Sequence, residues 1–152
     1  MAQTFVLEIA TPDRLLVREP VSEAQIPAAA GELGVRPDHA PLMAELGTGV
    51  LSYVMEGGRK QLSVAGGVVE LLPDRARVLA DVAEPADEID AQRAQEALRR
   101  AQGRLDRPPA GVDIARALNA LRRAQSRVGA ATGGSARTPA IPKGASSARD
   151  SR

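Results

Sequence analysis

Four charged side chains in the second half of the sequence have the types and the spacing to bind an anion. Asp90 and Arg93 lie at the start of one helical pattern, and Arg123 and Arg127 lie four residues apart near the end of a second one. If the two helices fold back antiparallel about residues 109 and 110, these side chains meet at one end of the pair. Three guanidinium groups around one carboxylate form a site for an anion such as a nucleotide phosphate. Asp90 could equally cap its helix or form an ion pair across the helices.

Catalytic chemistry has little support in the sequence. His39 is the only histidine, and it lies in the glycine- and proline-rich stretch Gly31–Pro41, where a structural hydrogen bond is more typical than a general base. The serine and threonine residues lack a neighbouring histidine or lysine that would activate a hydroxyl group. The acidic residues do not recur at the spacing of metal ligands, and no glycine-rich loop ends in Lys-Ser or Lys-Thr. We therefore expect no catalytic residue and no metal site.

The first 84 residues have the pattern of a β domain. Phe5, Leu7 and Ile9 alternate with other residues at the period of a strand with one buried face. Glu56-Gly-Gly-Arg59 predicts a tight hairpin, and Gly66-Gly67 predicts a bend or a bulge. Because the chain has one Phe, one Tyr and no Trp, the core must be mainly aliphatic. Further short strands are predicted at 15–17, 21–26, 50–55, 60–64, 68–72 and 77–82, and Gly31–Pro41 is expected to be a shaped loop.

The apolar period changes to that of helices at residue 87. Asp87 is positioned to cap a first helix, Pro108-Pro109 must end it, and Asp113 can cap a second helix. The helices would be about 30 and 24 Å long, and their short connection favours an antiparallel hairpin. Both apolar seams are rich in alanine, which buries little surface, so the helical hairpin should be held weakly. The seam residues are Ala91, Ala94, Leu98, Ala101 and Leu105, then Ile114, Ala117, Leu121, Ala124 and Val128.

The remaining residues, 129–152, combine Gly, Ala, Ser, Pro and Arg with a single isoleucine, Ile141. Such a segment cannot bury enough apolar surface to offset the entropy cost of ordering, so we expect it to be disordered. The predicted fold class is therefore α+β. A sandwich of short antiparallel strands over 1–84 precedes an antiparallel two-helix hairpin over 85–128 and a disordered tail over 129–152.

The formal net charge of +1 conceals a segregation of charge along the chain. Residues 1–84 hold twelve acidic and seven basic residues, residues 85–128 hold six and nine, and residues 129–152 hold one and four. The basic segments could attract nucleic acid, but the scarcity of aromatic side chains for base stacking argues against that function. The absence of cysteine excludes disulfides. Because no eighteen apolar residues run together, membrane association is expected only through partners.

Several motifs occur in a recognisable order. They are Gly31-Glu-Leu-Gly-Val-Arg-Pro-Asp-His-Ala-Pro41, Val64-Ala-Gly-Gly-Val-Val-Glu70, Val78-Leu-Ala-Asp81 and Ile89-Asp-Ala-Gln-Arg-Ala94. Together they resemble the epsilon subunit family of the rotary F-type ATP synthase, called delta in mitochondria, over about the first 130 residues. Asp38 stands where that family usually has glycine.

The resemblance implies a non-catalytic rotor subunit whose β domain links the gamma subunit to the c ring, with Glu32 and His39 near the c ring. It implies that the helical hairpin inhibits ATP hydrolysis when it extends toward the alpha and beta subunits. It further implies a regulatory ATP site at Asp90, Arg93, Arg123 and Arg127, with no other cofactor required. Such a subunit would belong to F1, at the cytoplasmic face of the bacterial plasma membrane, and would bind no nucleic acid.

Two other functions remain open from the residues themselves. One is a stand-alone module that senses nucleotide through Asp90 and Arg93, which copurification with or without gamma would distinguish from a rotor subunit. The other is a nucleic-acid-associated protein that uses the basic helices and tail. At the residue level, Glu32 could equally be an ordinary solvated turn residue.

Overall fold

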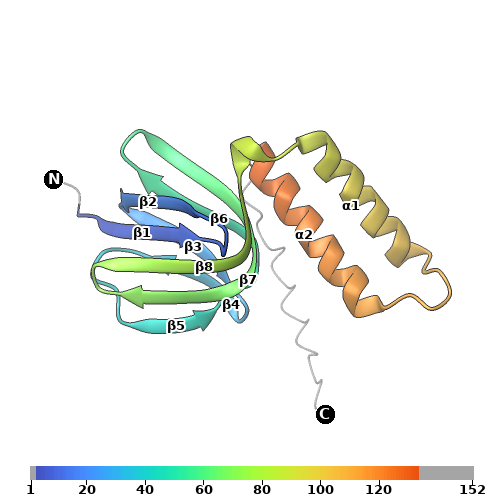
Figure 1. Cartoon of the computed structure of the whole chain (residues 1–152), viewed down its shortest axis with the longest axis horizontal. Helices are drawn as coiled ribbons and strands as arrows, with labels where there is room; N and C mark the ends of the chain where they lie inside the picture. Colours follow the sequence, from blue (N-terminus) through green and yellow to red (C-terminus); the bar gives the residue numbers. More distant parts are fainter. Residues whose placement is uncertain (1–2, 134–152) are drawn as a thin grey trace, which may run out of the picture.

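The computed structural model describes residues 3–133 and shows a β-sandwich followed by two antiparallel helices (Figure 1). The segment 134–152, for which the sequence predicts disorder, lies outside the described residues. The strands are β1 Phe5–Ala10, β2 Leu15–Val21, β3 Glu23–Ala28, β4 Gly31–Val35, β5 Leu42–Glu45, β6 Thr48–Met55, β7 Gly58–Leu72 and β8 Arg75–Pro85. The helices are the single 3-10 turn η1 Ala86–Glu88, α1 Ala91–Asp106 and α2 Ile114–Thr132.

The strands form one sheet in the order β2-β1-β8-β7-β6-β3-β4, with β5 paired to β7 beside this path. The sheet folds over into the two layers of a sandwich, as predicted. The prediction of antiparallel strands holds for every named pair in residues 3–133 except β1 and β8, which run parallel. These two strands stand at opposite ends of the domain's sequence, so no hairpin connects them and no turn fixes their relative direction.

Two glycines shape the longest strand. The segments 60–64 and 68–72, predicted as separate strands, belong to the 15-residue strand β7, whose first half pairs with β6 and whose second half pairs with β5. Gly66 and Gly67 join the halves with φ of 70° and 128°. The register with β8 is the same on both sides of them, so they form the predicted bend without inserting a residue.

The stretch Gly31–Pro41 is partly regular. Its first five residues form strand β4, which pairs with β3, so the prediction of a loop is wrong for residues 31–35. The hairpin predicted at Glu56–Arg59 is confirmed, with Met55 opposite Gly58. These turns fix the register of the strands that surround the core.

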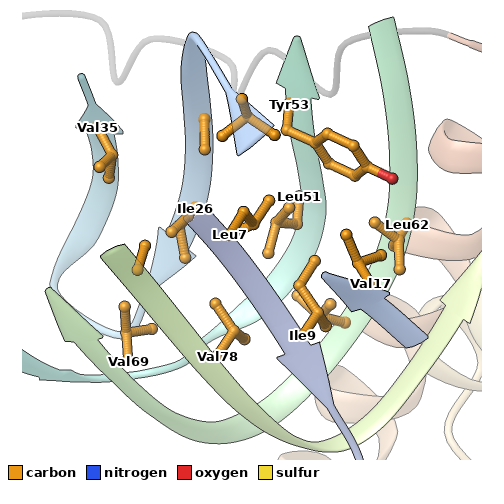
Figure 2. Close-up of a cluster of buried hydrophobic side chains, with 14 of the residues drawn as sticks. Leu7, Ile9, Val17, Ile26, Val35, Leu51, Tyr53, Leu62, Val69 and Val78 are labelled. Atoms are coloured by element: carbon orange, nitrogen blue, oxygen red, sulfur yellow. The ribbon is translucent and has the colours of Figure 1, made fainter. Parts of the chain in front are cut away.

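The core of the sandwich is aliphatic, as the composition predicts (Figure 2). Phe5, Leu7 and Ile9 of β1 are all buried, which confirms the alternation read from the sequence. Only Phe5 and Tyr53 contribute aromatic rings. Each large aliphatic side chain that is fully buried stabilises the fold by about 1.5 to 3 kcal/mol. Figure 2 shows such side chains meeting between the layers, among them Leu7, Ile26, Leu51, Leu62, Val69 and Val78.

Asp90, and not Asp87, caps the first helix. Its Oδ1 accepts a hydrogen bond from the backbone N–H of Arg93 at 3.1 Å. Asp87 lies in the 3-10 turn η1, and the extended backbone of Ile89 separates that turn from α1. The helix therefore starts three residues later than predicted, and its 16 residues span about 24 Å.

Helix α2 runs further than the sequence predicts. Asp113 caps it as expected, with Oδ1 accepting from the N–H of Arg116 at 3.1 Å. The helix ends at Thr132, and Gly133 follows in the left-handed conformation with φ of 68°. The sequence predicts that residues 129–132 belong to the tail, but they are helical, because the 1% exposed Ala130 packs against Ile89. Helix α2 lies on β6 and β7, and α1 packs mainly on α2 (Figure 1).

Candidate functional site

A groove of about 440 Å³ lies between the helical hairpin and strands β7 and β8. Both helices turn one face toward it, because residues three, four and seven positions apart share a face. On each helix that face alternates alanine with arginine, so small side chains line the groove and guanidinium groups surround them. The lining residues are Ser63, Val64, Ala65, Val82 and Glu84 of the sheet, Ala97, Arg100, Ala101 and Arg104 of α1, and Ala120, Arg123, Ala124 and Arg127 of α2.

The charge of the groove is strongly positive. Four arginines line it, and the only carboxylate among the lining residues is Glu84. Arg127 Nε lies 2.9 Å from Glu84 Oε1, and Arg127 Nη2 donates to Glu84 Oε2 at 3.4 Å. Within residues 3–133, Arg100, Arg104 and Arg123 form no ion pair. Several guanidinium groups that face one space can bind a ligand with several phosphate groups.

The structure places only two of the four residues proposed from the sequence in the groove. Arg123 and Arg127 line the groove, but Asp90 and Arg93 are not among its lining residues. The side chain of Asp90 caps α1, which is the alternative role that the sequence offered. The start of α1 does lie against the last turns of α2, as an antiparallel hairpin requires, because Ala94 and Ala130 share one buried cluster.

Sequence reasoning missed Glu84, Arg100 and Arg104 as lining residues. A signal for Arg100 was present, since it lies seven residues, or two helical turns, after Arg93 on the same helix. Arg104 follows four residues later. Glu84 had no such signal, because its position beside Arg127 depends on how α2 packs on the sheet.

His39 has a structural role. Its Nδ1 lies 2.5 Å from the carbonyl oxygen of Arg36, and its Nε2 lies 3.3 Å from that of Arg75. The ring also meets the edge of Phe5, with centroids 5.3 Å apart. The Nδ1 contact lies within the loop after β4, and the Nε2 contact links that loop to the start of β8. This supports the structural interpretation of the lone histidine over a general base.

Glu32 and Asp38 flank the same region. Glu32 is exposed on β4, the strand at one end of the sheet order, and the structure records no bond between it and His39. Asp38 has a φ of 61°, the left-handed conformation that glycine adopts most easily. Its N–H donates to the carbonyl oxygen of Pro73 at 3.0 Å. The loop therefore keeps a glycine-like backbone despite the aspartate at this position.

The outer face of strands β7, β8, β1 and β2 carries a second candidate surface. Val68, Leu79, Ala10 and Leu15 stand side by side across the four strands, and Val68, Leu79 and Leu15 are each 43% or more exposed. The next row is charged: Glu70–Arg77, Arg77–Glu8 and Glu8–Arg18 are ion pairs at 3.9, 3.1 and 3.7 Å. We refer to Val68, Leu79, Ala10 and Leu15 as the outer apolar row. Contiguous exposed apolar side chains beside a polar border are typical of an interaction surface.

Residues 3–133 lack two further kinds of feature. No group of three or more His, Cys, Asp or Glu side chains is placed to bind a metal ion. In the same part of the chain, no helix is both long enough and apolar enough to span a membrane.

Comparison with known proteins gives consistent matches. Residues 4–86 match the family described as ATP synthase, Delta/Epsilon chain, beta-sandwich domain, and residues 87–132 match the corresponding long alpha-helix domain. The ATP synthase epsilon chain of Solibacter usitatus is 55% identical over 111 residues, which cover 73% of this chain and 83% of that one. The epsilon chain of Koribacter versatilis is 50% identical over 105 residues, covering 69% and 74%.

Solved structures show the same fold. A chain of the Euglena gracilis mitochondrial ATP synthase, in a structure titled OSCP/F1/c-ring, superposes with a TM-score of 0.70 at 27% identity and covers 82% of this chain and 79% of that chain. A chain from the central stalk/c-ring structure of the Tetrahymena thermophila enzyme gives 0.50 at 14% identity, covering 86% and 96%. The two family matches, which together span residues 4–132, and the epsilon-chain relatives show that the chain belongs to the ATP synthase delta/epsilon chain family.

Proposed function

We propose that this non-catalytic subunit of the ATP synthase rotor joins the gamma subunit to the c ring through its sandwich and regulates ATP hydrolysis through its helical hairpin. The observation that carries the proposal is the division of the molecule into two separate apolar clusters. The sandwich has a core of its own, whereas the hairpin rests on it through a small cluster of Ile89, two valines and three alanines. The sandwich is therefore suited to bearing load, and the hairpin is suited to moving.

The outer apolar row supports an interface with gamma. An elongated helical partner with apolar side chains would cover Leu15, Leu79 and Val68, which the sandwich and the hairpin leave exposed. The neighbouring ladder of ion pairs would provide a polar border and fix the register of such a partner. Membership in the family supports this choice of partner.

Replacement of Leu79 with glutamate tests this interface. A charge in the middle of the outer apolar row should reduce capture of the gamma subunit by at least tenfold, because it would be buried without a partner. Ile114→Glu is the matched control and should leave capture of gamma unchanged. Ile114 is similarly exposed, at 49%, but it lies on α2 and outside the outer apolar row. Capture of gamma by the Leu79→Glu protein at the level of the unmodified chain would contradict the proposal.

For the c ring we propose the region of Glu32 and His39. Glu32 is exposed on a strand at the end of the sheet order, and the loop that contains His39 is held in shape by one contact within the loop and one with Arg75 of β8. Glu32→Ala should weaken assembly with the c ring without changing capture of gamma. If the Glu32→Ala protein assembles with the c ring as well as the unmodified chain does, Glu32 is not part of that interface.

Removal of residues 87–152 tests regulation. If the hairpin inhibits hydrolysis by extending toward the alpha and beta subunits, the assembled enzyme without it should hydrolyse ATP faster and still assemble. Unaltered hydrolysis by a complete complex would contradict inhibition. In its place within F1, the subunit would lie at the cytoplasmic face of the bacterial plasma membrane, held there by its partners.

The groove is the proposed regulatory ATP site. Arg123 and Arg127 would bind the phosphate groups together with Arg100 and Arg104. Asp90 and Arg93 do not line the groove, so they would join the site only through a ligand that extends from the groove toward the start of α1. Binding here would favour the folded hairpin, because the arginines come from both helices and face the sheet. The ligand would have to displace Glu84 from Arg127 or share that arginine with it.

Calorimetric titration with ATP tests this site. Arg123→Ala should weaken binding about tenfold or more, since a charge-assisted bond would be lost. Arg93→Ala should also weaken ATP binding if the start of α1 takes part in the site. Arg116→Ala is the control, because Arg116 is exposed in the first turn of α2 and does not line the groove. Absence of heat at millimolar ATP would retire the proposed ATP site.

A further inference from the structure

Ser126 of α2 is one of three buried polar residues in the part of the chain that the structure describes, with 3% of its surface exposed. Its Oγ donates to the carbonyl oxygen of Gly49 in β6 at 2.6 Å and lies 2.8 Å from Ser63 Oγ in β7. A hydroxyl group has one proton to donate, so the proton between the two serines comes from Ser63. The result is a chain of two hydrogen bonds that crosses from the sheet to the helix.

The other contacts of the hairpin with the sandwich are less directional. The cluster around Ile89 and Val50 includes Ala94 and Ala130, whose methyl groups bury little area. The ion pair of Arg127 with Glu84 is about one-third exposed on both sides and therefore screened by solvent. The serine contact is buried and directional, so it requires one position of α2 on the sheet.

We propose that Ser126, Ser63 and the carbonyl group of Gly49 form a latch that holds the helical hairpin on the sandwich and opens when the hairpin leaves. The latch rests on the proposed function, since it gives the regulatory hairpin its point of attachment. Ser63 also lines the arginine groove, and Ser126 directly precedes Arg127, which pairs with Glu84 there. A ligand in the groove therefore acts next to the latch, so its binding and the position of the hairpin are coupled.

Cysteine labelling of the isolated chain tests the latch. The chain has no cysteine, and Ala130 is 1% exposed between α2 and the sandwich, so Ala130→Cys provides a single thiol that reacts with N-ethylmaleimide only after the hairpin opens. Added to this background, Ser126→Ala should raise the labelling rate about tenfold, because Ser63 and Gly49 lose a buried partner. Ser63→Ala should raise it less, since Ser126 keeps its bond to Gly49.

The double variant and a matched serine provide the controls. Ser63→Ala with Ser126→Ala should label no faster than Ser126→Ala alone, since the two hydroxyl groups act as one unit. Ser52→Ala should leave the rate unchanged, because Ser52 is also buried but accepts its recorded hydrogen bond from Arg59 of β7 and not from the hairpin. A rate for Ser126→Ala equal to the background, or equal acceleration by Ser52→Ala, would overturn the latch.

A crosslink separates the latch from the regulatory function. The oxygen atoms of Ser63 and Ser126 are 2.8 Å apart, so sulfur atoms at these positions need only small shifts to bond. Ser63→Cys with Ser126→Cys should oxidise readily in the isolated chain, and failure to oxidise counts against the contact. In the assembled enzyme, the oxidised form should hydrolyse ATP faster than the reduced form. Ready oxidation and latch-dependent labelling without any effect on hydrolysis would keep the latch and reject regulation by the hairpin.

Discussion

Tyr53 is a residue whose ionisation should be visible in the stability of the protein. Burial raises the pKa of its hydroxyl above the ordinary 10.0, and the negative charges of Glu19 and Asp87 raise it further. The unfolded chain therefore loses this proton at a lower pH than the folded protein does, and the stabilisation is complete below pH 10 and declines above it. In urea titrations, the free energy of unfolding should fall from pH 10 upward.

Tyr53→Phe isolates this contribution. It removes the ionisable group, so its stability should fall less steeply over the same pH range. Glu19→Gln should give an intermediate slope, because it removes one of the two charges that oppose ionisation. Equal slopes for the parent and Tyr53→Phe would show that other groups determine the alkaline transition.

Gly67 is a position where only glycine fits. Its φ is 128°, and a Cβ atom there would lie 2.0 Å from the carbonyl oxygen of Leu79. Gly67→Ala should lower the free energy of unfolding by about 3 kcal/mol or more, through strain and displacement of β8. Gly34→Ala is the control, since a Cβ there meets nothing within 4 Å, and it should change stability by less than about 1 kcal/mol. Chemical denaturation of both variants distinguishes these outcomes.

Elements that depend on residues close together in the sequence were predicted best. The buried face of β1, the hairpin between β6 and β7, and the cap of α2 at Asp113 were all predictable, because each follows from residues a few positions apart. The start of α1 was not, since Asp87 and Asp90 are both good caps and the 3-10 turn decides between them. The groove was predicted only in part, because the packing of the hairpin on the sheet selects which arginines face it.

Helix α1 allows the two proposed roles of Asp90 to be separated. Asp90→Ala removes the cap, which costs about 1 kcal/mol, so the amide hydrogens of the first turn should exchange about fivefold faster. Asp90→Asn retains a capping oxygen and should leave this exchange almost unchanged. If Asp90→Asn also loses ATP binding, then the charge of Asp90 takes part in the nucleotide site. Equal exchange in all three proteins would mean that the cap does not stabilise α1.

At the scale of the whole molecule, the sandwich should fold without the helices. Every buried residue of the sandwich cluster lies between Phe5 and Ala80, and the hairpin contributes none of them. A chain of residues 1–86 should therefore keep its β-sheet circular dichroism and unfold cooperatively with urea. Its stability should be within about 2 kcal/mol of the whole chain, since the loss of the small cluster around Ile89 and of the serine bonds is offset in part by the entropy that residues 87–133 regain. A non-cooperative transition would show that the hairpin is part of the fold.

The order of strands was the least predictable feature at this scale. Period and turns indicate which segments are strands, but they do not say that the last strand of the domain lies between β1 and β7. That placement depends on contacts between residues about 70 positions apart, such as Val78 with Ile9, and no local pattern encodes them.

The central position of β8 has a consequence for how the protein forms on the ribosome. Within residues 3–133, strands β1 and β2 pair with the rest of the sheet only through β8, so the sheet stays incomplete until residue 85 has left the exit tunnel. The helices, which are neighbours in sequence, form quickly and arrive afterwards. Synthesis therefore finishes the slow long-range part first, and the helices dock onto a surface that already exists.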